Sequence, residues 1–283
     1  MSPSPQIVTT VAELRHRVAA FRQDDSRIAL VPTMGALHTG HLSLVQEAQQ
    51  HVDVVIVSIF VNPAQFAPHE DFDRYPRALM ADAEKLGATG ETDLIFAPSV
   101  GEMYPPGFAT KLEVGGPALG LESDIRPHFF SGVATVVSKL LLAAMPDVAM
   151  FGEKDYQQLL VVRRMVADLG LNIQILGAPI VRERDGLAMS SRNAYLSPEE
   201  RQTAGQMNIV LQGLVAELRD GMAIPAVEAA GKKGLLSAGF NSVDYVTVRS
   251  AENLEPLAAL DRPARVLAAA TVGTTRLIDN MAV

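Results

Sequence analysis

Two histidines, His38 and His41, follow an apolar run and a glycine-containing turn near the start of the chain. The run at 28–31 (Ile-Ala-Leu-Val) and the turn at 32–35 (Pro-Thr-Met-Gly) predict a strand that leads into a helix. Unpaired backbone N–H groups at a helix start attract phosphate, and side chains three apart on a helix are neighbours. Both rings could donate to one phosphate chain, and Gly40 lets it approach closely. The pattern favours nucleotide chemistry, in which such donors stabilise charge on an attacked phosphate. On its own it also fits a solvated helix face or half of a metal site.

Three further loops carry polar side chains where strands are expected to end. The loop at 62–66 has two amides, and an amide can bind a hydroxyl and a carboxylate together. The loop at 152–155 places an ammonium near a helix start and leads to Gln157 and Gln158. The loop at 188–193 sets two serine hydroxyls beside a guanidinium, which suits phosphate oxygens. Taken singly, each loop also fits an ordinary polar turn, and only the combination favours a nucleotide site.

The composition sets the class of protein and of partner. The 283 residues, 48% hydrophobic and 20% charged, suffice for two globular domains. A net charge of −8 argues against nucleic acid or an acidic membrane surface as the main partner. The absence of cysteine excludes disulfides, thiolate nucleophiles and zinc–thiolate sites, and no HExxH segment is present. We therefore expect no dedicated metal site.

Targeting segments are not expected either. The start Met-Ser-Pro-Ser-Pro-Gln lacks the charged and apolar regions of a signal peptide. The longest apolar stretches, at 54–61 and 132–145, are too short to span a membrane or are interrupted by Lys139. These features predict a cytoplasmic protein.

Apolar runs rich in valine and isoleucine alternate with helical segments over about the first 180 residues. Strands are predicted at 28–32, 53–61, 93–97, 147–151 and 172–176, and helices at 40–50, 78–86, 132–144 and 156–169. This order predicts an α/β fold with a doubly wound, Rossmann-like parallel sheet. In such sheets ligands bind beyond the carboxyl ends of the strands, where the four polar loops fall.

The pattern changes after Pro179. A serine cap at Ser197, a proline at 198 and a glutamate at 200 predict a long helix to about Asp220. A helix at 225–238 and strands at 243–248, 265–272 and 275–278 follow, with Gly273 at a turn. We expect a Rossmann-like domain at 1–179 and a smaller α+β domain at 180–283.

Four segments of the chain together resemble the pantothenate synthetase family. They are PTMGALHTGH, SIFVNPAQF, FGEKDYQQL and DGLAMSSRN, in this order and spacing. The resemblance runs from residue 8 to the end and includes Glu70-Asp71 before Tyr75-Pro76-Arg77. HTGH and MSSR also resemble two phosphate signatures of the HxGH nucleotidyltransferases and class I aminoacyl-tRNA synthetases. The resemblance implies a ligase that joins pantoate to β-alanine at the expense of ATP, through an enzyme-bound pantoyl adenylate, with release of AMP and pyrophosphate. It also implies a homodimer whose smaller domain closes over the site.

The resemblance further implies a role for each matching residue. His38 and His41 would steady the triphosphate and the transition state, with His41 a candidate proton donor, and Lys154 would neutralise the α-phosphate. The other positions implied in ATP binding are Met34, Gly35, Gly40, Gly152, Glu153, Asp155 near the ribose, Val181, Met189, and the pyrophosphate ligands Ser190, Ser191 and Arg192. Gln65, Gln158 and Asn62 would bind pantoate or β-alanine. Mg²⁺ is expected on phosphate oxygens and water.

One segment departs from the family pattern. At 126–130 the chain reads Arg-Pro-His-Phe-Phe, one position away from the family's Arg-Pro-any residue-His-Phe. His128 is therefore not included in the expected site. The segment could cover the pocket and shield the adenylate from water, or His128 could be a buried structural residue.

Alternative functions share parts of this pattern. A cofactor adenylyltransferase would share HTGH, but its phosphorylated acceptor would require more basic side chains than the amides at 62–66 and 157–158. A non-enzymatic nucleotide sensor has no need of Lys154 and Ser190–Arg192 around phosphates that it leaves intact. A dinucleotide oxidoreductase is disfavoured because the segment at 115–120 is not GxGxxG, and no P-loop is present.

Overall fold

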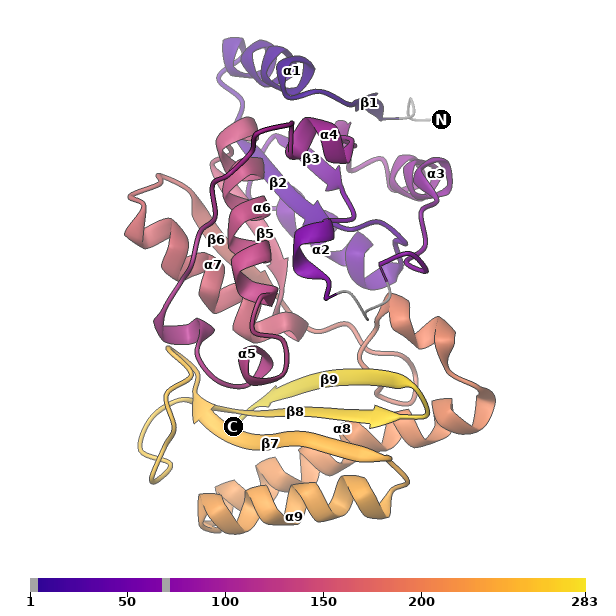
Figure 1. The fold of residues 1–283 in the computed structure, drawn as a ribbon, viewed down its shortest axis with the longest axis vertical. Helices are drawn as coiled ribbons and strands as arrows, with labels where there is room; N and C mark the ends of the chain where they lie inside the picture. The colour runs from indigo at the N-terminus through magenta and orange to yellow at the C-terminus, as the bar shows by residue number, and fades with distance from the viewer. Residues whose placement is uncertain (1–4, 68–71) are drawn as a thin grey trace. The chain divides into compact units, whose positions relative to one another are not determined.

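The computed structural model describes residues 5–67 and 72–283, so the expected Glu70-Asp71 segment lies outside the described residues. Two compact units make up the chain (Figure 1). The first comprises Met1–Glu153 and Val161–Pro179, and the second Lys154–Leu160 and Ile180–Val283. A short segment from the middle of the chain therefore groups with the C-terminal part.

The first unit is built on a six-stranded parallel sheet with the order β1-β4-β3-β2-β5-β6. The strands are β1 (Gln6–Val8), β2 (Ile28–Thr33), β3 (Val54–Ile59), β4 (Leu94–Phe96), β5 (Val148–Gly152) and β6 (Gln174–Ala178). The residues of the four inner strands β2, β3, β4 and β5 are mostly buried, as a parallel sheet covered on both faces requires. The predicted doubly wound α/β fold is confirmed.

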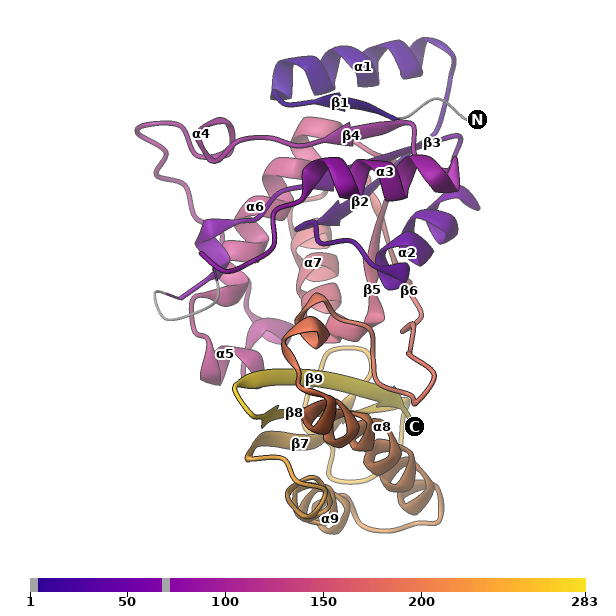
Figure 2. The same ribbon diagram turned by 90° about the vertical axis from the view of Figure 1, so that its right-hand side faces the viewer.

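Helices cover both faces of this sheet. On one face α2 (Thr39–Gln49) and α3 (Leu79–Thr89) bury Leu44, Val45 and Leu86 against the strands. Helix α6 (Phe129–Ala144) contacts β2 and α1 (Val11–Gln23), and β2 and β5 run between α6 and α2 in Figure 2. Helix α7 (Tyr156–Asp168) starts in the segment that groups with the second unit. Shorter helical pieces are η1 (Pro63–Gln65), α4 (Val100–Met103), η2 (Gly116–Ala118), α5 (Glu122–Ile125) and η3 (Glu153–Asp155).

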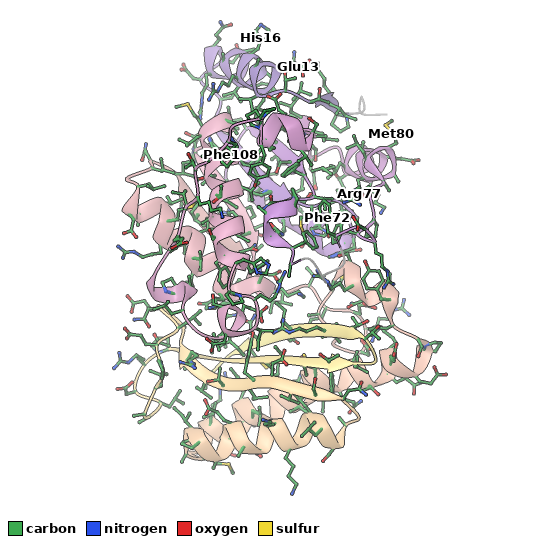
Figure 3. The ribbon with its side chains drawn as sticks, viewed as in Figure 1. Glu13, His16, Phe72, Arg77, Met80 and Phe108 are labelled. Carbon is green, nitrogen blue, oxygen red and sulfur yellow. The ribbon has the colours of Figure 1, made fainter. Side chains whose placement is uncertain are left out.

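The first strand and helix were not expected from the sequence. Strand β1 has three residues, too few for a periodic signal. A helix signal was present, because Thr10 and Glu13 form a capping box at the start of α1. The Thr10 hydroxyl accepts from Glu13 N at 3.2 Å, and the Glu13 carboxylate accepts from Thr10 N at 3.0 Å (Glu13 is labelled in Figure 3).

The second unit packs two helices against a three-stranded antiparallel sheet of order β7-β8-β9. Its elements are η4 (Ser191–Tyr195), α8 (Pro198–Arg219), α9 (Ile224–Ser237), β7 (Ser242–Ser250), β8 (Ala264–Val272) and β9 (Thr275–Ala282). The predicted cap of α8 is confirmed, since Ser197 and Glu200 bond to each other's backbone N–H groups.

Strands β6 and β9 differ most from the sequence prediction. Strand β6 lies two residues further along than expected, and β9 continues to Ala282, beyond the predicted end at residue 278. The longer β9 includes Asp279 and Asn280, which lie beyond the predicted end of the strand. Both are buried, at 3% and 2% exposure, because polar partners satisfy them.

Candidate active site

The order of the parallel strands defines where a ligand should bind in the first unit. Strand β2 lies between β3 and β5, so the chain proceeds to one side of the sheet after β2 and to the other after β5. Such a reversal leaves a crevice at the carboxyl ends of the two central strands. The turn that carries Met34 and Gly35 follows β2, and Gly152 ends β5. The sheet thus places the predicted nucleotide-binding loops at its switch point.

A buried carboxylate on α3 holds the turn after β2. Asp82, 1% exposed, accepts hydrogen bonds from Ala36 N at 2.8 Å and from Leu37 N at 2.9 Å. One helical turn later, Lys85 Nζ donates to Leu37 O at 2.7 Å. The turn needs this support because both Gly35 (φ +80°) and Ala36 (φ +51°) have left-handed backbone conformations. Helix α3 therefore fixes the path of the chain into α2.

The two histidines stand at the start of α2. His38 is the N-cap, with extended backbone, and His41 is the third residue of the helix. The ring centroids are 4.0 Å apart, as the three-residue spacing predicts. The backbone N–H of His38 donates to His41 Nδ1 at 3.3 Å. Because Nδ1 accepts, the neutral His41 ring carries its hydrogen on Nε2, in the form that donates from that atom.

The amides of the second loop also lie together. Asn62 and Gln65 are 1% and 8% exposed, and Asn62 Nδ2 donates to Gln65 Oε1 at 3.1 Å. Gln65 Nε2 contacts Met34 Sδ at 2.8 Å, which joins this loop to the turn after β2. Asn62 Oδ1 accepts from Tyr104 OH at 2.7 Å, and Asn62 Nδ2 also donates to Gly132 O at 3.2 Å. In this arrangement Asn62 orients Gln65, because both groups of its amide bond to the protein.

Tyr104 and Gly132 complete the support of this loop. Burial raises the pKa of Tyr104 to about 12, so the hydroxyl keeps the proton that it donates to Asn62 at neutral pH. Gly132 brings helix α6 against the loop. A methyl group at Gly132 would collide with the Ala64 carbonyl oxygen and lie 2.8 Å from Gln65 N. Only a glycine allows this approach of the two backbones.

Aromatic rings hold the chain on either side of residues 68–71. Phe66 packs edge-on against Phe72 at 5.4 Å and against Tyr75 at 6.0 Å between centroids. Arg77 lies 4.7 Å from the Phe72 ring centroid and donates to Phe72 O at 2.8 Å (both labelled in Figure 3). This cluster joins Phe66, next to Gln65, to Phe72 and Tyr75.

The segment at 126–130, which departs from the family pattern, also contacts the loop at 62–66. Arg126 donates to Gln65 O at 3.1 Å, and its guanidinium carbon lies 3.9 Å above the Phe129 ring. Phe129 occupies the position where the family pattern has histidine. His128 is the N-cap of α6, and its buried Nε2 has no hydrogen-bond partner within residues 5–67 and 72–283. The exclusion of His128 from the site stays a prediction.

The predicted phosphate-binding residues of the second unit fall in two segments. Lys154 lies in η3, with its ammonium 4.0 Å from Asp155 Oδ1. The Lys154 side chain is 20% exposed and that of Asp155 is 49% exposed. Gln158, one helical turn after Lys154, is half-buried, whereas Gln157 is buried. Partial exposure is what a ligand-binding ammonium needs, because full burial would oppose its charge.

A short hairpin presents the serine–arginine segment. Arg182 pairs with Ala188, and Met189 N donates to Val181 O at 3.0 Å. Ser190 then caps η4, and its hydroxyl accepts from Arg192 N at 3.3 Å. Since a hydroxyl also carries a donor, this contact leaves its hydrogen for another acceptor.

Ion pairs brace the same hairpin from α8. Arg201 pairs with Asp185 and, at 2.7 Å, with Glu183. The hydrogen bond from Arg201 is the largest influence on Asp185 and holds its carboxyl pKa below the ordinary 3.8, against the opposing effect of burial. Arg201 thus ties both acidic side chains of this hairpin to α8.

Several residues that organise the site were not expected from the sequence. Asp82 had a signal, since it shares the buried face of α3 with Leu79, Ala83 and Leu86 at helical spacing, where a carboxylate requires a partner. Tyr104 had none, because its partner Asn62 lies 42 residues away. The described residues hold no group of three histidine, aspartate or glutamate side chains that could bind a metal, and no helix among them is long and apolar enough to cross a membrane.

Comparisons with known proteins point to one family. Residues 6–282 match the family Pantoate-beta-alanine ligase. The chain is 53% identical to the pantothenate synthetase of Mesorhizobium japonicum, covering 98% of this chain and 97% of that protein, and 54% identical to that of Caulobacter vibrioides, covering 99% of each.

Comparison with solved structures indicates the same family. The pantothenate synthetase of Thermus thermophilus superposes with a TM-score of 0.90 at 47% identity, over 98% of both chains. The pantoate-beta-alanine ligase of Francisella tularensis, solved with beta-gamma ATP and beta-alanine, gives 0.83 at 33% identity, over 98% of this chain and 97% of that one. The chain thus belongs to the pantoate–β-alanine ligase family.

Proposed function

We propose that this protein makes pantothenate from pantoate, β-alanine and ATP in two steps, with pantoyl adenylate as the intermediate. The paired imidazoles of His38 and His41, 4.0 Å apart at a helix start beside the switch point of the sheet, are the observation that carries this proposal. A helix start supplies N–H groups and partial positive charge for a phosphate chain, and the two rings add directed donors.

The chemistry requires activation of the acid. A carboxylate is a poor acyl donor because its oxygen leaves badly, and attachment of AMP supplies a good leaving group. A pantoate carboxylate oxygen attacks the α-phosphorus in line, the bond to the bridging oxygen breaks, and pyrophosphate leaves. The β-alanine amine then attacks the acyl carbon, loses a proton, and AMP departs. No bond to the enzyme forms in either step.

The phosphate-binding roles follow from the donor sets. His41 donates from Nε2 to the phosphate that gains charge during attack, since its Nδ1 accepts from His38 N. His38 steadies the same triphosphate. Lys154 neutralises the α-phosphate with its partly exposed ammonium. Ser190, Ser191 and Arg192 bind the departing pyrophosphate, as a guanidinium and hydroxyls suit its oxygens.

The remaining roles concern the acid and the nucleoside. Gln65 binds pantoate with Gln158, and Asn62 contributes by holding the Gln65 amide. The positions that line the nucleotide are Met34, Gly35, Gly40, Gly152, Glu153, Asp155, Val181 and Met189, with Asp155 near the ribose. The first-unit residues act as the nucleotide- and pantoate-binding part of a Rossmann-like domain.

The nucleotide enters as its Mg²⁺ complex. Phosphate oxygens and water hold the ion, since Mg²⁺ keeps several waters and binds substrate phosphates. We further propose that the enzyme works as a cytoplasmic homodimer, and light scattering tests the oligomeric state.

The decisive experiment is mass spectrometry of a reaction that lacks β-alanine. Pantoyl adenylate should accumulate with ATP and pantoate, and should disappear when β-alanine is added, with AMP as product. If AMP formed without an adenylate of pantoate, the proposed order of steps would be wrong.

Two variants test the assignment of residues. His41→Ala should lower pantoate-dependent pyrophosphate release by at least about 100-fold, because a donor specific to the transition state is lost. Gln65→Ala should mainly raise the KM for pantoate. Unchanged turnover in the first variant, or a change in ATP affinity alone in the second, contradicts the respective role.

A further inference from the structure

Two adjacent polar residues of the last strand are both buried. Asp279 and Asn280 lie near the end of β9, at 3% and 2% exposure. Asp279 pairs with Ala268 of β8 and Asn280 with Leu267. Successive side chains of a strand point to opposite faces, so Asp279 projects to the face with the helix-packed Ala268 and Asn280 to the other. Asp279 and Asn280 thus place buried polar groups on opposite faces of one strand.

Asp279 holds the hairpin that leads to the serine–arginine segment. Its carboxylate accepts two hydrogen bonds from Arg182, at 2.6 and 2.9 Å, in a bidentate pair. The same guanidinium donates to Gly186 O at 3.0 Å, across the hairpin. Met189, next to Ser190, is fixed by its bond to Val181. Asp279 thereby determines where the hairpin presents Ser190–Arg192.

Asn280 holds the segment that carries Lys154. Its Nδ2 donates to the Lys154 carbonyl oxygen at 2.9 Å, and its Oδ1 accepts from Arg265. Arg265 in turn lies 3.8 Å above the ring of Tyr156, two residues after Lys154. The Tyr156 hydroxyl donates to Ala251 O at 2.7 Å. The backbone of Lys154 is therefore fixed to β9 directly and through this stack.

The burial of Asp279 and Asn280 indicates that they fix the geometry of their partners. A buried ion pair is a poor source of stability, since well-packed apolar residues of similar volume are often as stable. It does fix geometry, because a bidentate pair and an amide bond permit few arrangements. Here Asp279 contacts Arg182, in the hairpin that leads to Ser190–Arg192, and Asn280 contacts the backbone of Lys154.

We infer that Asp279 and Asn280 are positioning residues that hold Lys154 and Ser190–Arg192 where they can bind the phosphates of ATP. The inference rests on the proposed function, because it gives those segments their role. Asp279 acts through Arg182 on the groups that hold pyrophosphate, and Asn280 acts through the Lys154 backbone on the ammonium at the α-phosphate.

Asn280→Asp is the most selective change. It keeps an oxygen for Arg265 but removes the Nδ2 donor to Lys154 O, and replaces it with a repulsive oxygen. We expect kcat for pantoate-dependent ATP–pyrophosphate exchange to fall by about 10- to 100-fold, as for a displacement of about 1 Å at a reacting group. The KM for pantoate should stay within about threefold, because the side chains of Gln65 and Gln158 are both unchanged.

Asp279→Asn separates positioning from general stability. Pyrophosphate takes part only in the first step, so exchange should fall by about tenfold or more while transfer from preformed pantoyl adenylate to β-alanine stays within about threefold. Asp244→Asn is the matched control, since Asp244 pairs with Arg276 at 2.6 Å in the same sheet, and within the described residues no ion pair joins it to either segment. It should leave both steps unchanged.

The outcomes are distinct. If the wild-type protein shows no pantoate-dependent exchange, the proposed function fails and the inference with it. If the wild type is active but Asp279→Asn lowers both steps alike, or Asn280→Asp leaves kcat unchanged, the positioning role alone is overturned. Should Asp279→Asn not fold, the kcat and KM of Asn280→Asp decide.

Discussion

Removal of the Asp82 carboxylate is the perturbation whose effect the structure defines most closely. Asp82→Ala leaves the backbone N–H groups of Ala36 and Leu37 without the acceptors that lie at 2.8 and 2.9 Å. The carboxylate is 1% exposed, so water reaches the vacated site poorly. Each buried, unsatisfied donor costs about 1–3 kcal/mol, which gives about 2–6 kcal/mol for the pair.

Hydrogen exchange measures this loss at the residues concerned. Even the lower figure of about 2 kcal/mol should raise the exchange rates of the Ala36 and Leu37 amides by about 30-fold. Asp82→Asn should give an intermediate rate, because the amide keeps one acceptor but places an NH₂ group against the second N–H. Glu84→Ala is the control, since Glu84 is exposed on the same helix.

The same variant tests the link between this turn and catalysis. The turn sets the start of α2, so Asp82→Ala should also reduce pantoate-dependent pyrophosphate release, to a greater extent than Glu84→Ala. Amide exchange that stays within about threefold of the wild type would refute the account of how the turn is held, because no buried donor would then have lost its partner.

Three further predictions concern packing and pH. Gly132→Ala should destabilise the protein by about 3 kcal/mol or more and raise the KM for pantoate, since the new methyl group collides with Ala64 O; a denaturation midpoint equal to the wild type contradicts this. For Asp185 the folded-state pKa lies below the unfolded value of 3.8, because Arg201 bonds to the ionised carboxyl. This bond stabilises the fold above pH 3.8, and its contribution is lost as the pH falls through the folded-state pKa. Asp185→Asn should therefore show a weaker acid dependence of stability, measured as unfolding free energy against pH. For Tyr104 the folded-state pKa is raised from 10.0 to about 12, so the contribution of the protonated hydroxyl to the free energy of unfolding is complete below pH 10.0 and is lost as the pH rises towards 12. Tyr104→Phe should lack this alkaline loss. An alkaline stability profile identical to that of the wild type would count against the buried hydroxyl.

The helices and strands that the sequence predicted well are those with long apolar runs or with a cap of their own. The strands at 28–33, 54–59 and 148–152 are apolar runs, and the helix after Ser197 carries its own cap. Local composition determines such elements, so no tertiary information was needed. Strand β1, with three residues, depends on pairing with β4 more than 80 residues away and could not be recognised from its own residues.

A candidate site could be proposed from the sequence to the extent that its residues are of types that bind a ligand. Histidines, amides and a serine–arginine segment, when they occur together at strand ends, are typical of a nucleotide site. The supporting residues were not predictable, because their partners are distant in sequence: Asp82 holds Ala36 from 46 residues away, and Asn280 holds Lys154 from 126 residues away. Asn62 shows the converse, since its amide type indicated ligand binding while its contacts show that it orients Gln65.

Side chains alternate between the two faces of β9, and this alternation limits which insertions and deletions the strand tolerates. A single residue inserted or deleted between Thr275 and Asp279, with the pairing to β8 otherwise kept, would turn every later side chain to the opposite face. Asp279 and Asn280 would then lose their contacts to Arg182 and Lys154 in the same event. Point substitutions can weaken one attachment at a time, whereas a change of one residue in length here would break both together.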